Sequence, residues 1–264
     1  MRYTLENLYG VRGQSIVVVG GSSGIGLEIA CAVADLGAKI AIIGRTGEKV
    51  ANALSMLEKR ATTCLAFQAD VLDEKAMANA FAAIADAFGQ IDGLVNCAGI
   101  NHVGAFAEQP FEVFHEIVDT NLMGIVMACK LVAPYMLGKE NGRIVNISSV
   151  RSIQGKSLFS AYCASKAAVD GFTRALAVEW IRKGVNVNCV AAGIVVTDFN
   201  RADIEKHPES FKKRINAIPR GKPGETSLMV SPVITLLSPG SAHIVGQTIF
   251  VDGGATIGDT YVME

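Results

Sequence analysis

The stretch Gly20-Gly21-Ser22-Ser23-Gly24-Ile25-Gly26 decides the fold, because it joins a predicted strand to a predicted helix. The β-branched run 15–19 predicts the strand, and the apolar stretch 25–36 predicts a helix that ends at Gly37. Glycines let a backbone approach a pyrophosphate closely, and a helix N-terminus offers free N–H groups and a favourable dipole. The spacing differs from the commoner G-x-G-x-x-G, so a purely structural turn is the alternative. Its place after the first strand favours dinucleotide binding.

Short β-branched runs alternate with longer amphipathic stretches through the rest of the chain. Further strands are expected over residues 39–43, 63–67, 93–96, 143–147, 185–190 and 248–251, and further helices over 48–60, 74–88, 111–137, 159–182 and 226–237. Strands that are apolar on both faces and joined by helices indicate a parallel sheet covered on both sides. Right-handed crossovers make such a sheet doubly wound, and its ligands bind beyond the carboxyl ends of the strands. The sequence therefore predicts one α/β domain over residues 1–264, with its site at that edge.

One segment, residues 196–224, departs from the alternation of strands and helices. It is rich in charge and contains Pro208, Pro219 and Pro223. Segments of this kind next to a ligand site often close over the ligand, so we interpret it as a substrate lid.

Composition excludes several classes of protein. Half of the 264 residues are hydrophobic, and the formal net charge of −1 argues against a nucleic-acid partner, which requires a basic face. The first residues lack an apolar signal core, and the uninterrupted apolar runs are far shorter than the roughly 20 residues of a membrane span. The six cysteines form no C-x-x-C pair, which favours free thiols over disulfides or zinc. A cytoplasmic protein without a membrane partner is expected.

The end of the second predicted strand bears on the choice of cofactor. An acid about 20 residues beyond the glycine turn often binds the ribose 2′-hydroxyl of a dinucleotide. Gly44 occupies the expected place of that acid, and Arg45 follows it. Because a guanidinium pairs well with a 2′-phosphate, we expect NADP(H) to be favoured over NAD(H). The alternative is an exposed arginine at the start of a loop.

Further landmarks run through nearly the whole chain. They are Asp70-Val71, Asn96-Cys97-Ala98-Gly99, Asn121, Ser149, Tyr162-x-x-x-Lys166 and Val251-Asp252-Gly253-Gly254. With the glycine turn, and in this order, they make the chain resemble the short-chain dehydrogenase/reductase family. The resemblance implies a Rossmann-like single domain with strand order 3-2-1-4-5-6-7, helices on both faces, and hydride transfer between a nicotinamide cofactor and a carbonyl or alcohol carbon. It also implies a homotetramer or homodimer, and chemistry without a metal.

Three positions depart from the family pattern. Gly20 replaces a threonine, Cys97 replaces an asparagine, and Ala192 replaces a proline. The first change removes a hydrogen bond from the cofactor turn, and the second removes an amide near the adenosine. The third removes a residue of fixed φ from the loop over the nicotinamide. Cofactor affinity is expected to suffer, whereas no proton-transferring group is lost.

Tyr162 is the predicted proton-transferring residue. Carbonyl reduction needs a proton for the developing alkoxide, and a tyrosine can supply it if its pKa moves toward neutrality. Lys166 lies four residues further on the same helical face, where its ammonium would favour the phenolate. By the resemblance, Lys166 also holds the nicotinamide ribose, Ser149 hydrogen-bonds the substrate oxygen, and Asn121 holds a water that links Lys166 to solvent. Ser149 is preferred over Ser148 for its spacing to Tyr162.

The resemblance also assigns the cofactor contacts. These are Gly20, Ser22, Ser23, Gly24, Ile25, Gly26, Arg45, Asp70, Val71, Asn96, Ala98, Gly99, Tyr162, Lys166, Gly193, Ile194 and Thr197. Asp70 would contact adenine, with a helix cap or loop acid as the alternative. Asp252 is interpreted as structural.

Four residues are candidates for the substrate pocket: His102, Arg151, Gln154 and Phe159. The stretch 148–152 looks like that of family members acting on sugar acids, and Arg151 could hold a substrate carboxylate. A loop or subunit-contact role is the alternative for Arg151. His102 is expected in the pocket wall rather than in catalysis.

Three functions are compatible with these residues. The first is a dehydrogenase or reductase of a sugar, sugar acid or polyol. The second is a 3-oxoacyl thioester reductase, which would need a basic patch for an acyl carrier. Residues available for that patch are Lys206, Lys212, Lys213 and Arg214, although a solvated helix face also explains the last three. The third is a dinucleotide-binding regulator without turnover, against which the four intact catalytic positions argue.

Overall fold

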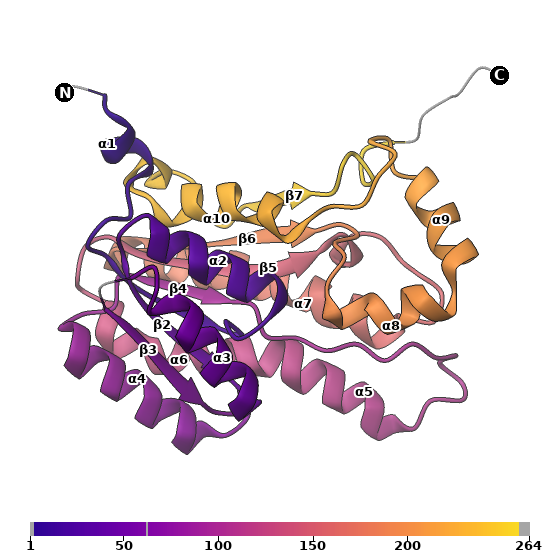
Figure 1. Cartoon of the computed structure of the whole chain (residues 1–264), viewed down its shortest axis with the longest axis horizontal. Coiled ribbons are helices and arrows are strands. Elements are labelled where there is room, and N and C mark those ends of the chain that lie inside the picture. The colour runs from indigo at the N-terminus through magenta and orange to yellow at the C-terminus, as the bar shows by residue number, and fades with distance from the viewer. Residues whose placement is uncertain (1–2, 62, 259–264) are drawn as a thin grey trace.

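The computed structural model describes residues 3–61 and 63–258, and a seven-stranded parallel sheet lies at its centre (Figure 1). The strand order is β3-β2-β1-β4-β5-β6-β7, as the resemblance implied, and neighbouring strands run parallel to one another. The strands are β1 (Ser15–Val19), β2 (Lys39–Gly44), β3 (Cys64–Gln68), β4 (Gly93–Asn96), β5 (Gly142–Ser149), β6 (Val185–Ala192) and β7 (Thr248–Val251).

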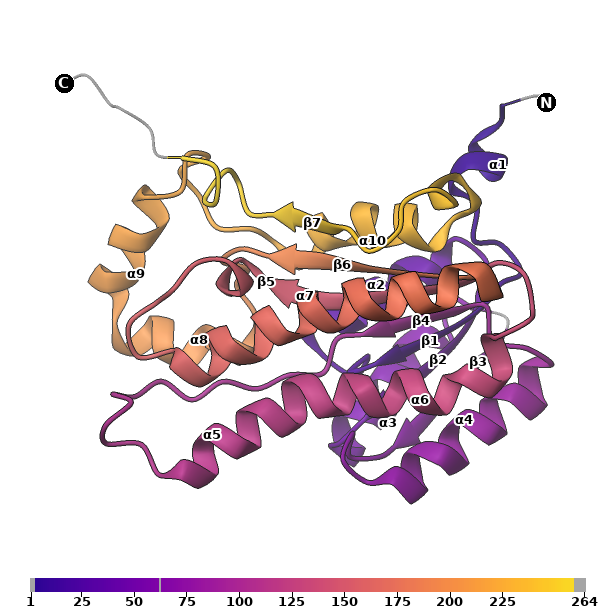
Figure 2. The ribbon, with the colours of Figure 1, turned by 180° about the vertical axis from the view of Figure 1, so that it is seen from behind.

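Helices cover both faces of the sheet (Figures 1 and 2). The α-helices are α1 (Leu5–Tyr9), α2 (Gly24–Asp35), α3 (Gly47–Leu57), α4 (Glu74–Phe88), α5 (Phe111–Val118), α6 (Gly124–Met136), α7 (Ser160–Trp180), α8 (Asp198–Lys206), α9 (Pro208–Asn216) and α10 (Val230–Leu237). Short turns of helix are η1 (Asp119–Met123, a π-helix), η2 (Val150–Ser152), η3 (Ile181–Lys183), η4 (Thr226–Met229) and η5 (Pro239–Ser241).

Alternating side chains of the strands build two separate cores. Val17 and Val19 of β1 pack with α4, α6 and α7 on one face, whereas Ile16 and Val18 pack with α2, α3 and α10 on the other. Because successive strand residues point to opposite faces, a strand buried on both sides must be apolar throughout. This explains the unbroken apolar run that identified β1 in the sequence.

The predicted strands and helices are confirmed, with boundaries that shift by a few residues. β5 and β6 run further than expected, to Ser149 and Ala192, so both strands carry the sheet up to the candidate site. The expected long helix over 111–137 is continuous but contains the π-helical turn η1. The proposed lid, residues 196–224, contains the helices α8 and α9, which the sequence did not predict.

The helical span Phe111–Met136 is long and apolar enough, by length and composition alone, to cross a membrane. Its uninterrupted apolar runs are shorter, which is why the sequence predicted no span. In the fold, Ile125, Ala128 and Val132 of this span are buried in one core cluster with residues of α4 and α7. The apolar side of the helix thus packs on the sheet.

Candidate active site

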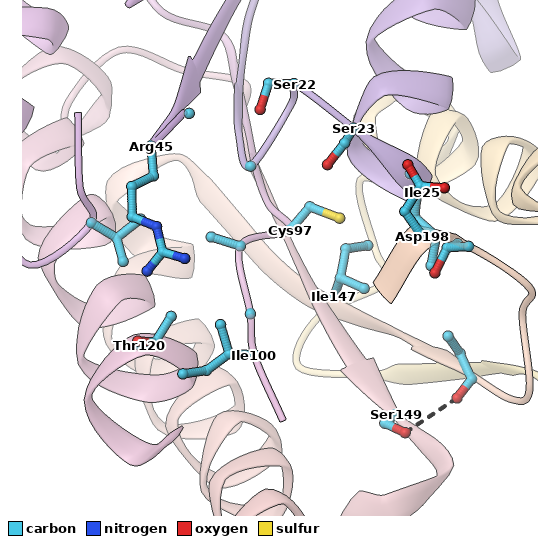
Figure 3. Close-up of a pocket in the computed structure, with 18 of the residues that line it drawn as sticks. Ser22, Ser23, Ile25, Arg45, Cys97, Ile100, Thr120, Ile147, Ser149 and Asp198 are labelled. Carbon is cyan, nitrogen blue, oxygen red and sulfur yellow. Dashed lines mark hydrogen bonds between the residues drawn. The ribbon is translucent and has the colours of Figure 1, made fainter. Parts of the chain in front are cut away.

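The carboxyl ends of the strands open into a pocket of about 430 Å³ (Figure 3). Its wall is made of Gly20, Ser22, Ser23, Gly24, Ile25, Ile43, Gly44, Arg45, Thr46, Lys49, Ala69, Asp70, Val71, Cys97, Ala98, Gly99, Ile100, Thr120, Ile147, Ser148, Ser149, Tyr162, Lys166, Ala192, Gly193, Val195, Thr197, Asp198 and Asn200. Arg45 and Ser149 lie toward opposite sides of the view in Figure 3. The pocket therefore joins the predicted cofactor residues to the predicted catalytic residues.

The glycine turn is shaped by close backbone contacts. Gly20 has φ +80°, and a Cβ atom there would lie 2.5 Å from the backbone nitrogen of Ala98. A side chain at position 20 would be strained in this backbone conformation, so the turn requires a glycine there. A Cβ on Gly26 would collide with the carbonyl oxygen of Gly20. Gly26 therefore packs beneath the turn and is not part of the pocket wall.

The end of β2 is open to a cofactor group at Arg45. A Cβ atom on Gly44 would lie 2.5 Å from the hydroxyl oxygen of Ser22, so the side chain of an acid has no room there. Arg45 lines the pocket, together with Lys49 from the first turn of α3. Lys49 was not predicted as a site residue from the sequence. Its spacing of four residues from Arg45 was the signal that could have identified it.

Asp70 and Val71 line the pocket beyond β3, as predicted. One carboxylate oxygen of Asp70 accepts a hydrogen bond from the backbone of Leu72 at 3.0 Å, and the N-cap of α4 is Asp73 instead. Asn96 is not in the wall: its amide nitrogen donates to the Asn146 side-chain oxygen at 2.8 Å inside the sheet. The pocket wall begins one residue later, at Cys97.

Asn121 lies within the π-helical turn and is fully buried. Its side-chain oxygen accepts from the Ile100 backbone N–H at 2.7 Å, and its amide nitrogen donates to the Ile100 carbonyl at 2.9 Å and to the Ser165 hydroxyl at 3.1 Å. Single π-helical turns in α-helices are frequent at functional sites. Here the turn presents Asn121 to the loop after β4, behind the pocket wall.

Ser149 and Tyr162 meet at the catalytic end of the pocket. The Ser149 hydroxyl donates to the Ala192 carbonyl at 3.4 Å and forms a hydrogen bond with Tyr162 (Figure 3 shows the former). Ser148, by contrast, has a buried hydroxyl in the wall that forms no hydrogen bond within the described chain. Ser149, rather than Ser148, is therefore the serine that lies beside Tyr162.

Burial opposes the fall in the pKa of Tyr162 that proton transfer near neutral pH would need. Burial raises the pKa of Tyr162 to about 12, and the hydrogen bond with Ser149 and the charge of Arg151 offset that rise only in part. The Lys166 ammonium instead donates to the Ile147 carbonyl at 2.8 Å. Burial also lowers the pKa of Lys166, an effect that two thiols and Asp170 oppose. Tyr162 therefore holds its proton at neutral pH.

The other two departures from the family pattern sit in the wall. Cys97 faces the pocket, and burial raises the pKa of its thiol to about 11, so the side chain is a neutral, weakly polar contact. Ala192 ends β6 and supplies the carbonyl that accepts from Ser149. After it, a Cβ atom on Gly193 would lie 2.7 Å from the Cα atom of Asp252. Close packing against the C-terminal turn thus holds this loop where proline is missing.

The loop beyond β6 differs in one position from the prediction. Gly193 and Thr197 line the pocket, whereas Ile194 does not and Val195 takes its place. Several residues of the pocket wall were not predicted from the sequence, among them Lys49, Thr120, Val195, Asp198 and Asn200. Asp198 and Asn200 come from the segment read as a lid, so that segment does contact the site.

The four substrate candidates occupy different environments. His102 is half-exposed, and its Nε2 lies 3.1 Å from a carboxylate oxygen of Glu116, outside the pocket wall. Gln154 donates to the Ala255 carbonyl at 2.7 Å, and Arg151 donates to the Gln154 side-chain oxygen at 3.4 Å. The Phe159 ring packs edge-on against Tyr162, with 6.4 Å between the centroids. Of these four residues, Phe159 packs against Tyr162, and none of the four lines the pocket wall.

A nicotinamide dinucleotide fits this pocket. The turn before α2 brings bare backbone to the wall, since a side chain on Gly20 would meet Ala98. The N-terminus of α2, a helix of 12 residues, opens at the same turn and favours a pyrophosphate. Arg45 offers a cation to the adenosine end, and the unpartnered hydroxyl of Ser148 offers a polar contact near the catalytic end.

Comparison with known proteins agrees with the geometry. A family model for short chain dehydrogenases matches residues 14–208. A human 3-oxoacyl-[acyl-carrier-protein] reductase is 38% identical over 90% of this chain and 95% of its own length. A galactitol 2-dehydrogenase (L-tagatose-forming) from Cereibacter sphaeroides is 34% identical over 96% and 98%. A solved candidate NAD(P)-dependent gluconate 5-dehydrogenase from Beutenbergia cavernae, with bound NADP, is 35% identical over 94% and 98%, with a TM-score of 0.88.

Proposed function

Because this chain belongs to the short-chain dehydrogenase/reductase family and is an NAD(P)-dependent oxidoreductase, we propose that it uses NADP(H) to interconvert a carbonyl and a secondary alcohol on a sugar, sugar acid or polyol. One observation carries the proposal. Ser149, Tyr162 and Lys166 line the same pocket as the glycine turn, so a proton-transferring group and a dinucleotide cradle share one cavity.

The proton chemistry follows from the side chains. When bound, the cofactor supplies or accepts the hydride. The Tyr162 phenol, which keeps its proton because burial raises its pKa to about 12, donates that proton to the substrate oxygen during reduction. The hydroxyl of Ser149 binds the same substrate oxygen. The Lys166 ammonium adds a positive charge beside the Tyr162 ring. Asn121 acts behind the wall by holding the Ile100 peptide.

The preference for NADP(H) is supported by charge. Arg45 and Lys49 both line the adenosine end of the pocket, and Gly44 leaves no room for the acid that a ribose 2′-hydroxyl would require. Two cations beside that position favour a 2′-phosphate. This end of the pocket therefore supports NADP(H) over NAD(H).

The substrate class is supported by the catalytic end. Arg151 follows Ser149 by two residues, and its charge acts on Tyr162, which supports a substrate with a negatively charged group. Relatives named as galactitol and gluconate dehydrogenases act on a sugar alcohol and a sugar acid. A polyhydroxylated substrate with or without a carboxylate fits this combination.

A 3-oxoacyl thioester reductase is the second candidate. The human relative favours it, and Lys212 and Lys213 are exposed on α9, where an acidic carrier protein could reach them. A dinucleotide-binding regulator without turnover is the third, and the grouping of Ser149, Tyr162 and Lys166 in one wall weighs against it.

The setting of the enzyme is also a proposal. We expect one catalytic domain over residues 1–264 in a homotetramer or homodimer, located in the cytoplasm. A small-molecule substrate is expected, with neither nucleic acid nor membrane as a partner; the net charge of −1 argues against a nucleic-acid partner.

Turnover on a matched panel tests the proposal. NADPH oxidation should be measured with keto sugar acids, neutral ketoses and a short 3-oxoacyl thioester, each also with NADH. Rapid turnover on a sugar-type carbonyl with NADPH is the expected result. Turnover on the thioester alone would establish the second candidate. Tight NADPH binding without turnover on any compound would favour the regulator.

A further inference from the structure

A turn with an unusual backbone conformation precedes the helix that carries Tyr162. Leu158 has φ +69°, a left-handed conformation that is costly for a side chain as bulky as leucine, and its exposed side chain gains little packing in return. The Phe159 N–H donates to the Lys156 carbonyl at 3.2 Å, and the Gly104 N–H donates to the Leu158 carbonyl at 3.2 Å. Such strain persists where the surrounding structure imposes it, and it is concentrated at functional sites. The turn is therefore a candidate for a role in the active site.

The turn determines where the ring of Phe159 lies. Phe159 is the residue before α7, and its carbonyl accepts from the Cys163 N–H at 2.8 Å, so its backbone joins the first turn of the helix. Residues three positions apart lie on one face of a helix. The rings of Phe159 and Tyr162 accordingly contact each other, with 6.4 Å between the centroids and 83° between the planes. This edge-to-face arrangement is one that aromatic pairs favour, and it restricts the Tyr162 ring.

A lysine holds the Phe159 ring in turn. The Lys156 ammonium nitrogen lies 3.8 Å from the centroid of this ring. A cation at such a distance is attracted to the ring face, more strongly where it is removed from water, and Lys156 is partly buried. Further along α7, the Lys166 ammonium lies 5.8 Å from the centroid of the Tyr162 ring. The contacts thus run from Lys156 to Phe159, from Phe159 to Tyr162, and from Tyr162 to Lys166.

Two of these four side chains line the pocket and two do not. Tyr162 and Lys166 belong to the pocket wall, whereas Phe159 and Lys156 lie outside it. An influence of Phe159 or Lys156 on a reaction in the pocket therefore passes through Tyr162. Proton transfer needs the phenol oxygen within hydrogen-bond reach of the substrate oxygen, and a small displacement of a reacting group greatly reduces its rate.

We propose that Lys156 and Phe159 are positioning residues for the proton transfer. The Lys156 ammonium holds the Phe159 ring, and this ring holds the Tyr162 phenol in the orientation that reaches the substrate oxygen. The inference rests on the proposed function and deepens its mechanism. The strained turn at Leu158 is the backbone feature that brings Lys156 and Phe159 to this place, at the N-terminal end of α7 (Figure 2).

Variants at both positions, made with and without Tyr162→Phe, test the proposal. Lys156→Met removes the charge while keeping a long side chain, and it should lower kcat on the best carbonyl substrate about threefold to tenfold. Phe159→Ala should lower kcat about 10²-fold, because the phenol is no longer held in place. The KM for the substrate and the affinity for NADPH should change less than about twofold, since neither residue lines the pocket.

Two further variants serve as controls. Lys156→Arg keeps a cation over the Phe159 ring and should retain most of the wild-type kcat. Lys75→Met removes an exposed cation of α4 and should change neither kcat nor KM. Loss of activity in Lys156→Arg as large as in Lys156→Met would contradict the role of the cation.

The Tyr162→Phe background separates positioning from other roles. Without the phenol oxygen there is no group left to position, so Lys156→Met and Phe159→Ala should cause no further loss of the residual turnover. Equal fold losses in both backgrounds would overturn the proposal, because the two residues would then act on the fold or the cofactor. A rise in KM confined to acidic substrates, with kcat unchanged, would also overturn it, since Lys156 would then contact the substrate. A wild-type enzyme without turnover on any carbonyl compound would overturn the proposed function, and the positioning role with it.

Discussion

The Lys166 ammonium nitrogen lies 5.8 Å from the centroid of the Tyr162 ring, one helical turn along α7. It donates a hydrogen bond to the Ile147 carbonyl at 2.8 Å, so the backbone of β5 holds it at the catalytic end of the pocket. Its position beside the ring, rather than on the phenol oxygen, fits a tyrosine whose pKa burial raises to about 12. The phenol is therefore in its protonated form, which proton donation requires.

The first prediction concerns pH. Reduction needs the protonated phenol of Tyr162, and oxidation of the alcohol needs the phenolate. Because burial raises the pKa to about 12, the phenolate fraction grows about tenfold per pH unit through the measurable range. At saturating cofactor, kcat/KM for oxidation should rise steadily between about pH 6 and 10, while that for reduction stays nearly level. An oxidation rate that levels off near neutral pH would show that the pKa of Tyr162 is much lower in the enzyme with bound cofactor.

The second prediction concerns cofactor choice. Arg45→Asp should raise KM for NADPH and lower it for NADH, because the carboxylate repels a 2′-phosphate and can accept from a ribose hydroxyl. Lys49→Gln should weaken NADPH binding by about tenfold and leave NADH binding unchanged. Lys59→Gln, an exposed cation just beyond α3, is the matched control. Equal losses for the two cofactors would remove the 2′-phosphate assignment.

The third prediction concerns Asn121. Asn121→Ala leaves the backbone N–H and carbonyl of Ile100 without their hydrogen-bond partner. The free energy of unfolding should therefore fall by about 2–4 kcal/mol. The value of kcat should also fall, because the loop after β4 loosens. Ser165→Ala removes only one of the bonds and should cost about 1 kcal/mol. Denaturant unfolding and turnover check both variants. A larger loss for Ser165→Ala would show that Asn121 does not hold the loop.

The fourth prediction concerns the C-terminal turn. Burial tends to raise the pKa of Asp252, but hydrogen bonds from Thr256 and Gly254 outweigh it and hold that pKa below its ordinary value. A carboxyl whose folded pKa is depressed stabilises above its unfolded pKa and loses that contribution as pH falls through the folded pKa. Asp252→Asn should therefore lower the free energy of unfolding by about 1–3 kcal/mol at neutral pH, and the difference should shrink below about pH 4.

Thermal unfolding across pH measures this contribution. Asp86→Asn, at an exposed acid in α4, is the control and should change the melting temperature little at any pH. A difference between Asp252→Asn and the wild type that persists unchanged in acid would mean that the turn is held by packing and not by the carboxylate.

Much of the fold was predictable because its signals are local. Unbroken apolar runs such as 15–19 identify strands that are buried on both faces, and the glycine turn identifies where the first helix begins. The sites at strand ends follow from the parallel topology, so Arg45, Asp70 and Ser149 could be placed near one another without a structure.

The remainder depends on tertiary contacts that spacing does not encode. Asn96 and Ser148 carry polar side chains at strand positions, yet Asn96 turns into the sheet while Ser148 faces the pocket. The packing of the loop after β6 decides that Val195 rather than Ile194 reaches the wall. The helix α9 could not be anticipated from charge and proline content, and Ile215, next to Arg214, is buried in the fold.

The role of Tyr162 is the central claim, and one paired measurement tests it most directly. Tyr162→Phe removes only the phenol oxygen, so NADPH should bind with nearly unchanged affinity when followed by nicotinamide fluorescence. Turnover on the best carbonyl substrate should fall by about 10²–10⁴-fold, because the general acid is lost. Tyr9→Phe alters a half-exposed tyrosine near the N-terminus and should retain both NADPH binding and turnover. Full turnover in Tyr162→Phe would contradict the assignment of Tyr162 as the proton donor.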